Sequence, residues 1–268
     1  MSTPSYLNRR EFVQSVGGLV VSGALASTSA RFDTKRQTVP AQKENIEAVL
    51  FDAFPVFDFR LVATRAEELF PTRGNDLMTS WRTRQFEYTW LRLVARDYAD
   101  FWRCTEDALR YTANVMKLDL TPEKRDRLMS AFLELKAWPE ATAALMALKG
   151  SGIRLGFLSN FTPGMLSACI KSSGLDGVFE QVISTDRIKS FKPDPATYQL
   201  GVDALRLSKQ RVLFAAFAAW DASGAKHFGY PTFWVNRLDS LPEELGVAAT
   251  DGAGRTMTDL LAFVNARR

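Results

Sequence analysis

Histidine and cysteine are scarce in this 268-residue sequence, which has one of the former and two of the latter. The single histidine, His227, lies in a predicted helix beside Lys226, and no serine–histidine–acid triad can be built convincingly around it. Cys104 and Cys169 fall in predicted helices among apolar neighbours. Two thiols do not make a disulfide framework in a chain of this size, so we expect both to be buried and free.

A block of one charge sign is also missing. The formal net charge is +4, of which Arg9, Arg10 and Glu11 contribute +1, and the other basic residues are mixed with acidic ones along the chain. No run of Lys and Arg interleaved with aromatic residues appears, so the sequence gives no indication of nucleic-acid binding. With 46% hydrophobic and 24% charged residues, the composition is that of a soluble globular protein.

The N-terminal apolar stretch, about residues 13–25, is too short and too rich in Gly and Ser to span a membrane comfortably. A charged start before it and small residues up to Ala30 after it are the layout of a secretory signal. Residues 9–12, RREF, resemble a twin-arginine signal, the route for proteins exported already folded. We predict a signal peptide at 1–30, a polar linker at 31–45, and a periplasmic or otherwise exported protein with no membrane span in its mature form. The alternative is an amphipathic N-terminal helix or a tethered anchor.

One early strand, about residues 46–52, is followed by a long segment with apolar side chains at three- and four-residue spacing, which is typical of helices. From residue 153 onward strands and helices alternate, with strands at 153–158, 178–184, 211–217 and 232–235 and helices near 163–173, 195–206, 221–228 and 255–267. This alternation predicts a parallel sheet covered on both faces. The expected fold class is α/β, a Rossmann-like core made of residues 46–59 and 136–268 with an all-helical insertion at 60–135.

Polar side chains gather where the predicted strands end. Asp52 closes the first strand, Ser159-Asn160 closes the next, and Asp221 follows a later one. The segment FKPDPATY (191–198) adds Lys192 just before a helix whose start is fixed by proline. Ligands of such sheets bind beyond the carboxyl ends of the strands, so we expect these residues to meet in one site.

This order of residues resembles the haloacid dehalogenase (HAD) superfamily, and within it the 2-haloacid dehalogenases that act on (S)-2-haloacids. Three further segments carry the resemblance, namely WRTRQFEYTWLR (81–92), DFWRCTEDALRYT (100–112) and WDASGAKHFGYPTFWVNR (220–237). It covers roughly residues 46–237 and implies a HAD-like core with the insertion as a helical cap. It also implies a homodimer, whose interface would contain some of the cap aromatics if they do not pack the cap itself.

The resemblance implies a reaction in two steps. Asp52 attacks the α-carbon, inverts it and forms an ester with the enzyme, and water then attacks the ester carbonyl. Arg82, reaching down from the cap, and Asn160 receive the departing halide. The implied substrate is a short 2-haloalkanoic acid, which is converted to a 2-hydroxy acid without a cofactor.

The other implied roles belong to residues around the nucleophile. Lys192 keeps Asp52 ionised, because an adjacent cation favours the charged form of a carboxyl group. Tyr198 orients the network, and Asp221 supports Lys192 and the hydrolytic water. Ser159 and nearby backbone N–H groups hold the substrate carboxylate. The apolar walls of the pocket are two aromatic residues, Phe101 and Trp220.

A metal-dependent phosphatase of this superfamily needs a second carboxylate two residues after the nucleophile, and here that position is Phe54. Only Asp221 remains of the acidic cluster that would hold Mg²⁺, an ion that takes several oxygen ligands. Expulsion of a halide requires no proton transfer to the leaving group. The residues therefore favour dehalogenation over phosphoryl transfer and predict no metal.

Four positions depart from the family pattern. Pro55 and Val56 replace glycine and threonine, and Ala216 and Ala218 replace serine and an asparagine that helps to place the hydrolytic water. Pro55, Val56 and Ala216, together with Phe217, are expected to make the pocket drier and smaller. Three hypotheses stay open: a working dehalogenase with a rearranged water site, an exported relative that binds a carboxylate or stays trapped as its alkyl ester, and another hydrolase of the superfamily.

Overall fold

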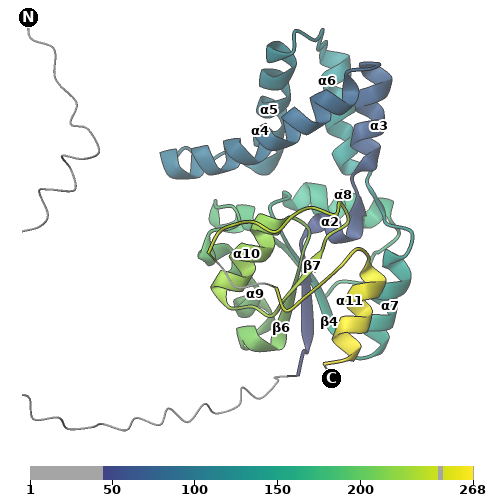
Figure 1. Cartoon of the computed structure of the whole chain (residues 1–268), viewed down its shortest axis with the longest axis vertical. Helices are drawn as coiled ribbons and strands as arrows, with labels where there is room; N and C mark the ends of the chain where they lie inside the picture. The colour runs from purple at the N-terminus through teal and green to yellow at the C-terminus, as the bar shows by residue number, and fades with distance from the viewer. Residues whose placement is uncertain (1–44, 247–249, 268) are drawn as a thin grey trace, which may run out of the picture. The chain divides into compact units, whose positions relative to one another are not determined.

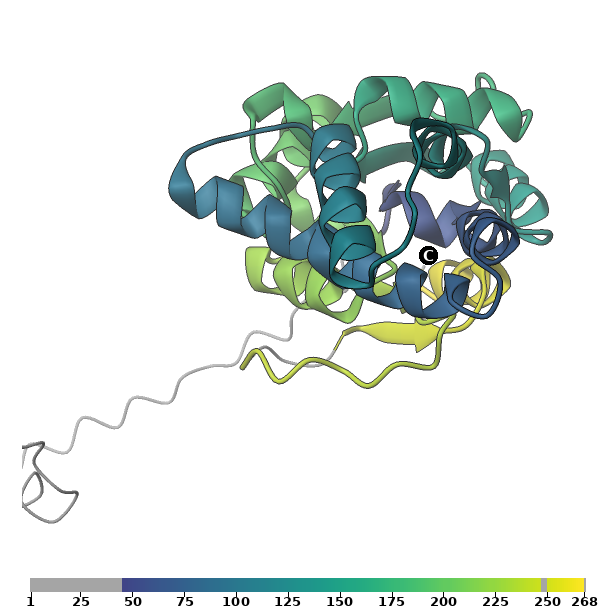
Figure 2. The same cartoon turned by 90° about the horizontal axis from the view of Figure 1, so that it is seen from above.

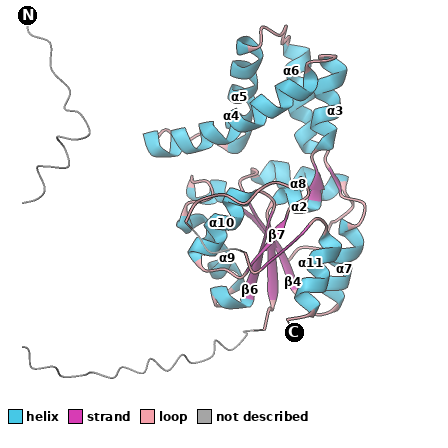
Figure 3. Ribbon diagram, viewed as in Figure 1, coloured by secondary structure: helices cyan, strands magenta, loops and turns pink. Residues whose placement is uncertain are grey.

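A six-stranded sheet forms the core (Figure 3). The structure, a computed structural model, describes residues 45–246 and 250–267. The strands lie in the order β5-β4-β1-β6-β7-β8, and each neighbouring pair is parallel. Their bounds are β1 (Ala48–Phe51), β4 (Arg154–Ser159), β5 (Gln181–Ser184), β6 (Val212–Ala216), β7 (Thr232–Val235) and β8 (Gly252–Gly254). This arrangement confirms the predicted α/β class.

The central strand β1 is buried on both faces because its side chains alternate between two helical layers. Val49 and Phe51 join the core cluster on the face covered by α7 (Ala141–Gly150), α8 (Pro163–Ser172) and α11 (Met257–Asn265). Ala48 and Leu50 join a second cluster beneath α9 (Pro195–Leu205) and α10 (Ala219–Phe228). The two layers lie on opposite sides of the strands in Figure 1.

Four helices and a 3₁₀ turn occupy the insertion between β1 and β4. They are α3 (Arg60–Leu69), α4 (Gly74–Ala95), α5 (Phe101–Val115), α6 (Pro122–Ser130) and η1 (Ala131–Leu133). Two short strands, β2 (Phe57–Asp58) and β3 (Lys136–Ala137), pair antiparallel where the chain leaves the sheet and where it returns. The insertion lies beyond the carboxyl end of the sheet, and α4 and α5 cross over it when seen from above (Figure 2).

Two side chains of the described part of the cap donate hydrogen bonds to the core. The indole nitrogen of Trp90, on α4, donates to the backbone oxygen of Lys192 at 3.2 Å. The hydroxyl of Tyr98, in the loop after α4, donates to Asp186 at 2.8 Å. The cap is therefore anchored to the same core segment that carries the predicted catalytic lysine.

Most predicted elements are present with small shifts at their ends. The strand at 232–235 is found at those residues, whereas the helix predicted at 221–228 begins at Ala219. The prediction missed β8, which consists of Gly-Ala-Gly and has no apolar run, and the two-residue strands β2 and β3, which are too short to show a periodicity. The predicted signal peptide lies outside the described residues.

Both cysteines are buried and free, as predicted. Cys104 lies on α5 and Cys169 on α8, and burial raises the pKa of their thiols to about 11 and about 12. Within the described ranges, no helix combines the length and the apolar character that crossing a membrane requires.

Candidate active site

Asp52 lies directly after β1, where it begins the one-turn helix α2 (Ala53–Val56). One carboxylate oxygen accepts a hydrogen bond from the backbone N–H of Phe54 at 3.4 Å, so the side chain caps this turn. Ser159, the last residue of the neighbouring β4, donates its hydroxyl to the other oxygen at 3.3 Å. The side chain is 13% exposed and lines a pocket between the sheet and the cap. Asp52 is therefore both a helix cap and a pocket residue.

Lys192 lies between two carboxylates beneath this pocket. Its Nζ is 2.8 Å from Oδ1 of Asp52 and 2.5 Å from Oδ2 of Asp221. The second oxygen of Asp221 accepts a hydrogen bond from the hydroxyl of Tyr198 at 2.7 Å. The side chains of Lys192 and Asp221 are each 1% exposed, so this ion pair is screened very little by solvent.

The protonation states follow from burial and from these neighbours. Burial alone would lower the pKa of Lys192, but the carboxylates of Asp221 and Asp52 raise it above its ordinary value. Burial raises the pKa of Asp221 to about 6, against the opposing effect of Lys192, and the charge of Asp52 adds to the increase. Burial and Asp221 raise the pKa of Tyr198 well above its usual range. At neutral pH Lys192 is thus a cation and Tyr198 a neutral donor.

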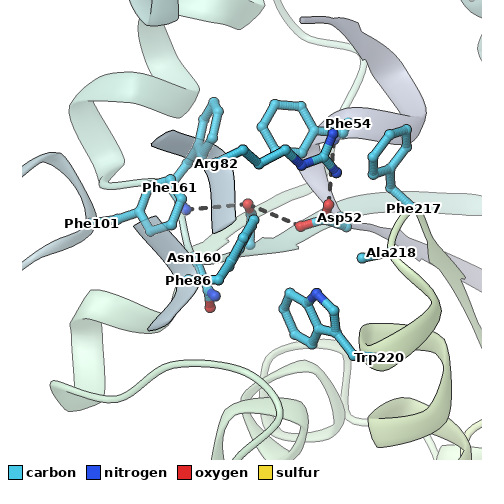
Figure 4. A pocket seen from close by; sticks show the side chains of 11 residues that line it. Asp52, Phe54, Arg82, Phe86, Phe101, Asn160, Phe161, Phe217, Ala218 and Trp220 are labelled. Carbon is cyan, nitrogen blue, oxygen red and sulfur yellow. Dashed lines mark hydrogen bonds between the residues drawn. The ribbon is translucent and has the colours of Figure 1, made fainter. Parts of the chain in front are cut away.

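The pocket above Asp52 is narrow and mostly aromatic, with a cavity volume of about 10 Å³. Its lining residues are Asp52, Phe54, Arg82, Phe86, Phe101, Ser159, Asn160, Phe161, Phe217, Ala218 and Trp220. Figure 4 shows Arg82 on one side of this space and Trp220 on the other. Neighbouring rings touch around it: Phe54 and Phe161 have centroids 5.3 Å apart, and those of Phe86 and Trp220 are 5.2 Å apart.

Arg82 brings a poorly solvated positive charge into this apolar space. It lies on α4, one turn before Phe86, and its guanidinium carbon is 5.0 Å from the ring centre of Phe217 and 5.1 Å from that of Phe59. Burial lowers the pKa of this side chain, and the charge of Asp52 partly offsets that effect. Among the residues that the structure describes, Arg82 has no carboxylate within salt-bridge distance and no hydrogen-bond acceptor. Its N–H donors are therefore available to an anion.

Asn160 offers a second donor with a fixed orientation. Its side-chain oxygen accepts hydrogen bonds from the backbone N–H of Lys192 at 3.0 Å and from the hydroxyl of Thr185 at 3.1 Å. The amide nitrogen is buried and has no partner in the described part of the chain. A buried donor without a partner is rare and destabilising, so it is a natural contact for a ligand atom that accepts.

The donor set does not fit a magnesium ion. Within residues 45–246 and 250–267, no three side chains of His, Cys, Asp or Glu come together as metal ligands would. The two carboxylates near the pocket, Asp52 and Asp221, are bridged by the ammonium group of Lys192, which occupies the space between them. Mg²⁺ requires an oxygen-rich octahedral site, which these residues do not provide.

The structure brings the nine residues expected from the sequence together in two layers. One layer lines the pocket and comprises Asp52, Arg82, Phe101, Ser159, Asn160 and Trp220. The other lies behind Asp52, outside the pocket lining, and comprises Lys192, Tyr198 and Asp221. Both oxygens of Asp221 are engaged within that second layer, so it contacts the pocket only through Lys192 and Asp52.

Several wall residues were missed or misplaced by the sequence analysis. Phe86 and Phe161 line the pocket, although in the sequence they are indistinguishable from packing aromatics. Phe217 lines it as expected, but the expectation for Pro55, Val56 and Ala216 was wrong, since none of them belongs to the pocket lining. Val56 and Ala216 have no exposed surface because they pack into the two core clusters.

An aspartate–lysine pair at the carboxyl end of the central strand, under a helical cap, is an arrangement that suits covalent catalysis by a carboxylate nucleophile. Comparison with known families supports this class. The profile of the haloacid dehalogenase-like hydrolases matches residues 28–229. The chain belongs to this family.

Characterised relatives place it more narrowly. The (S)-2-haloacid dehalogenase of Pseudomonas sp. (strain YL) is 40% identical over 75% of this chain and 87% of its own length. Haloacetate dehalogenase H-2 of Moraxella sp. (strain B) is also 40% identical, over 76% of this chain and 91% of its own. Among solved structures, an L-2-haloacid dehalogenase with 42% identity gives a TM-score of 0.81 over 82% of this chain and 99% of its own. The enzyme from Xanthobacter autotrophicus with chloropropionic acid covalently bound is 32% identical, with a TM-score of 0.76 over 82% and 98%.

The buried ion pair predicts a pH-dependent loss of stability in Lys192→Met. Removal of one partner leaves uncompensated buried charge, which typically costs about 3–5 kcal/mol. We expect a loss of that size at pH 7. It should shrink at pH 5, because the pKa of Asp221 is already raised to about 6 and protonation removes the charge that Lys192 had compensated. Urea unfolding at both pH values measures this difference.

The matched control is Lys226→Met. Lys226 pairs with Asp251 at 2.7 Å, but both side chains are about one quarter exposed, at 24% and 25%. Partly solvated pairs contribute about 1 kcal/mol or less, so this variant should lose little stability at either pH. A Lys192→Met deficit no larger than that of the control, or one that is the same at both pH values, would contradict the assignment.

Proposed function

We propose that this protein hydrolyses short 2-haloalkanoic acids to 2-hydroxy acids through an ester on Asp52. The observation that carries the proposal is the opposition of charges in the pocket. A carboxylate held by Lys192 faces two donors that have no partner among residues 45–246 and 250–267, the guanidinium of Arg82 and the amide nitrogen of Asn160. The names of the relatives, which act on 2-haloacids and haloacetate, support the same substrate class.

In the first step, an oxygen of Asp52 attacks the α-carbon from the side opposite the halogen. The new C–O bond forms as the C–halogen bond breaks, the bonding electrons leave with the halide, and the carbon is inverted. Arg82 and Asn160 receive the halide, and their fixed donors stabilise charge as it develops. No acid is needed for this leaving group. Lys192, 2.8 Å from Oδ1 of Asp52, holds the carboxylate in place for the attack.

The substrate is held by the rest of the pocket. On binding, the hydroxyl of Ser159 exchanges its hydrogen bond to Asp52 for one to the substrate carboxylate, which neighbouring backbone N–H groups also bind. Phe101 and Trp220 contact the alkyl group. These rings also exclude water from the reacting atoms, and in such surroundings the attraction between a carboxylate and a cation is stronger than in bulk solvent. A 2-haloacid combines the two features that this pocket recognises, an anionic end and a compact apolar end with a polarised halogen.

In the second step, water attacks the carbonyl carbon of the Asp52 ester. The ester C–O bond to the protein carboxyl group breaks, the 2-hydroxy acid leaves, and the carboxylate of Asp52 is regenerated with release of one proton. Asp221 holds Lys192 beside this carbonyl, and Tyr198 fixes Asp221 through the 2.7 Å hydrogen bond. Lys192 thereby stabilises the negative charge that develops on the carbonyl oxygen of the ester as water attacks.

The central prediction is halide release from (S)-2-chloropropionate by the wild-type protein, with a loss of more than about 10³-fold in Asp52→Asn. Arg82→Lys should lose about 10²–10³-fold in kcat/KM. The ammonium group of lysine is compact and lacks the planar set of N–H donors that the guanidinium directs at the leaving halide. A halide electrode or colorimetric halide assay measures both, and mass spectrometry of the wild-type protein should show a transient adduct on Asp52.

Arg84→Lys serves as a control on the same helix. Its guanidinium stacks on Tyr111 at 4.7 Å and pairs with Glu87, away from the pocket, so its activity should stay within about twofold of wild type. Magnesium-dependent phosphate release from a phosphoester, with no halide release from haloacids, would instead identify another hydrolase of the superfamily.

A second candidate function is a single alkylation without efficient turnover. Ala218 presents only a methyl group to the pocket, and the polar side chains that line it are Asp52, Arg82, Ser159 and Asn160. None of these is a free general base, since Asp52 carries the ester at that stage. A chain built this way would capture one haloacid per site and hydrolyse the ester slowly.

Ala218→Asn tests which function applies. Restoring an amide at this wall should place the hydrolytic water and raise steady-state turnover, with the initial burst of halide unchanged because alkylation does not use that group. Rapid-quench halide measurements separate the burst from the steady state. If turnover of Ala218→Asn is equal to or below that of wild type, the water-placement argument fails.

We further propose export through the twin-arginine route, based on residues 9–12. Cell fractionation should find the protein outside the cytoplasm, and replacement of Arg9-Arg10 by Lys-Lys should retain it inside.

We also propose that the protein self-associates as a homodimer. Exposed apolar side chains on neighbouring cap helices support this proposal, among them Leu91 and Val94 on α4 and Val115 on α5, which are 60%, 84% and 62% exposed. Light scattering of the exported form should give twice the monomer mass; a monomer mass would exclude the dimer.

A further inference from the structure

The one-turn helix α2 carries the nucleophile at its start, and its backbone carbonyls need partners. The last four carbonyl groups of a helix have no partner within the helix itself. Because α2 has only four residues, all of its carbonyl groups need partners from residues that follow it or lie elsewhere. Ala53 is satisfied locally by the N–H of Phe57. The carbonyls of Phe54, Pro55 and Val56 all accept hydrogen bonds from outside the turn, and two residues supply them.

Trp138 supplies two of these donors. It follows β3 directly, in the segment by which the chain returns from the cap to the sheet. Its backbone N–H donates to Val56 at 2.9 Å, and its indole nitrogen donates to Phe54 at 3.0 Å. The return segment of the cap therefore contacts the nucleophile turn through both the main chain and the side chain of one residue.

Arg237 supplies the third donor from the other side. It lies two residues after β7, its side chain is 6% exposed, and one terminal nitrogen donates to the carbonyl of Pro55 at 2.7 Å. The same nitrogen is 2.8 Å from Glu140, and the guanidinium lies 4.2 Å from the ring centre of Trp138. Glu140 also accepts from the backbone N–H of Met257 at 3.2 Å, which fixes it at the start of α11. Arg237 is thus rigidly held by the core.

We propose that Trp138 and Arg237 are positioning residues that clamp the nucleophile turn and so fix where Asp52 points. Asp52 precedes the turn and caps it through the N–H of Phe54, so a displacement of the turn moves the carboxylate. The clamp also explains how the turn is held with Pro55 and Val56 in place of the family's glycine and threonine. Val56 lacks the hydroxyl with which a threonine could form a hydrogen bond in the loop. Through Trp138, the clamp also links Asp52 to the segment by which the chain returns from the cap to the sheet. This inference rests on the proposed dehalogenation.

The test is the rate of the first halide release in variants that weaken the clamp. Trp138→Phe removes the indole donor and part of the ring but keeps the backbone N–H that donates to Val56, and a shift of the reacting atoms by a fraction of an ångström to 1 Å reduces rates by up to about 10²-fold. We expect the burst rate constant with 2-chloropropionate to fall about tenfold, with KM within about twofold, because the groups that bind the substrate are untouched.

Trp81→Phe is the matched control. Trp81 is buried on α4, and its indole nitrogen donates to the carbonyl of Thr105 at 2.8 Å, so the same chemical change occurs away from the nucleophile turn. Both variants should lose similar thermal stability. The control should keep a burst rate within about twofold of wild type, and this contrast separates positioning from general destabilisation.

Arg237 gives an independent series that applies even if Trp138→Phe does not fold. Arg237→Met should slow the burst about 10²-fold, and Arg237→Lys should recover part of it because an ammonium can still reach the carbonyl of Pro55. Arg154 is the control: it pairs with Glu180 and donates to the carbonyl of Leu205 at 2.9 Å, at the far end of β4 from the site. Arg154→Met and Arg154→Lys should leave the burst within twofold.

The outcomes are distinguishable. A wild-type protein that releases no halide overturns the proposed function, and this inference with it. Halide release by the wild type, with burst rates in Trp138→Phe and Arg237→Met equal to those of their controls, overturns the clamp alone. Slow bursts in both clamp variants, partial recovery in Arg237→Lys and unchanged KM support it.

Discussion

A buried ammonium group between two carboxylates organises the whole site. Lys192 is 2.8 Å from Asp52 and 2.5 Å from Asp221, and both Lys192 and Asp221 are almost fully buried, while Asp52 reaches the pocket. Desolvation of such groups costs several kcal/mol for each ion and is offset only when their geometry and remaining hydrogen bonds are good. The remaining partners are present: Tyr198 donates to Asp221, and Ser159 donates to Asp52. With two carboxylates and one ammonium group, the cluster keeps a net negative charge. Asp52 is its carboxylate at the pocket, where it is available as a nucleophile.

The fold holds this cluster by bringing distant segments to one edge of a parallel sheet. Asp52 follows β1, Ser159 ends β4, and Asp221 lies in the first turn of α10 after β6. The backbone around Lys192 is fixed from two further directions, since its N–H donates to Asn160 and its carbonyl accepts from Trp90 of the cap. The lysine therefore connects the nucleophile, the expected halide site and the cap. Movement of the cap would change the position of the ammonium group that pairs with Asp52.

The sequence predicted the parts of this structure that depend on local pattern. The apolar runs of β1, β4, β6 and β7 indicated buried parallel strands, and polar residues at their ends indicated a shared site. It could not predict which aromatic rings face the pocket, because Phe86 and Phe161 differ from packing residues only through the placement of the cap over the sheet. The strand β8 was equally invisible, since its Gly-Ala-Gly sequence becomes a strand only by pairing with β7. Contacts of Trp138 with the nucleophile turn likewise depend on how the two ends of the insertion meet.

The aromatic lining of the pocket, which leaves little room for water, has opposite effects on the two steps of the proposed reaction. Alkylation needs a carboxylate with little water around it, a poorly solvated cation for the halide and no competing water. A pocket of Phe54, Phe161 and Phe217 around Arg82 favours these conditions. Hydrolysis of the ester needs one water in a defined place, held by at least two polar groups. Ala218 offers none at its wall, and Asp221 directs both oxygens away from the pocket, toward Lys192 and Tyr198. The aromatic lining therefore favours ester formation, and the speed of the complete cycle depends on whether water can enter beside Asp52 once the halide has left its place near Arg82 and Asn160.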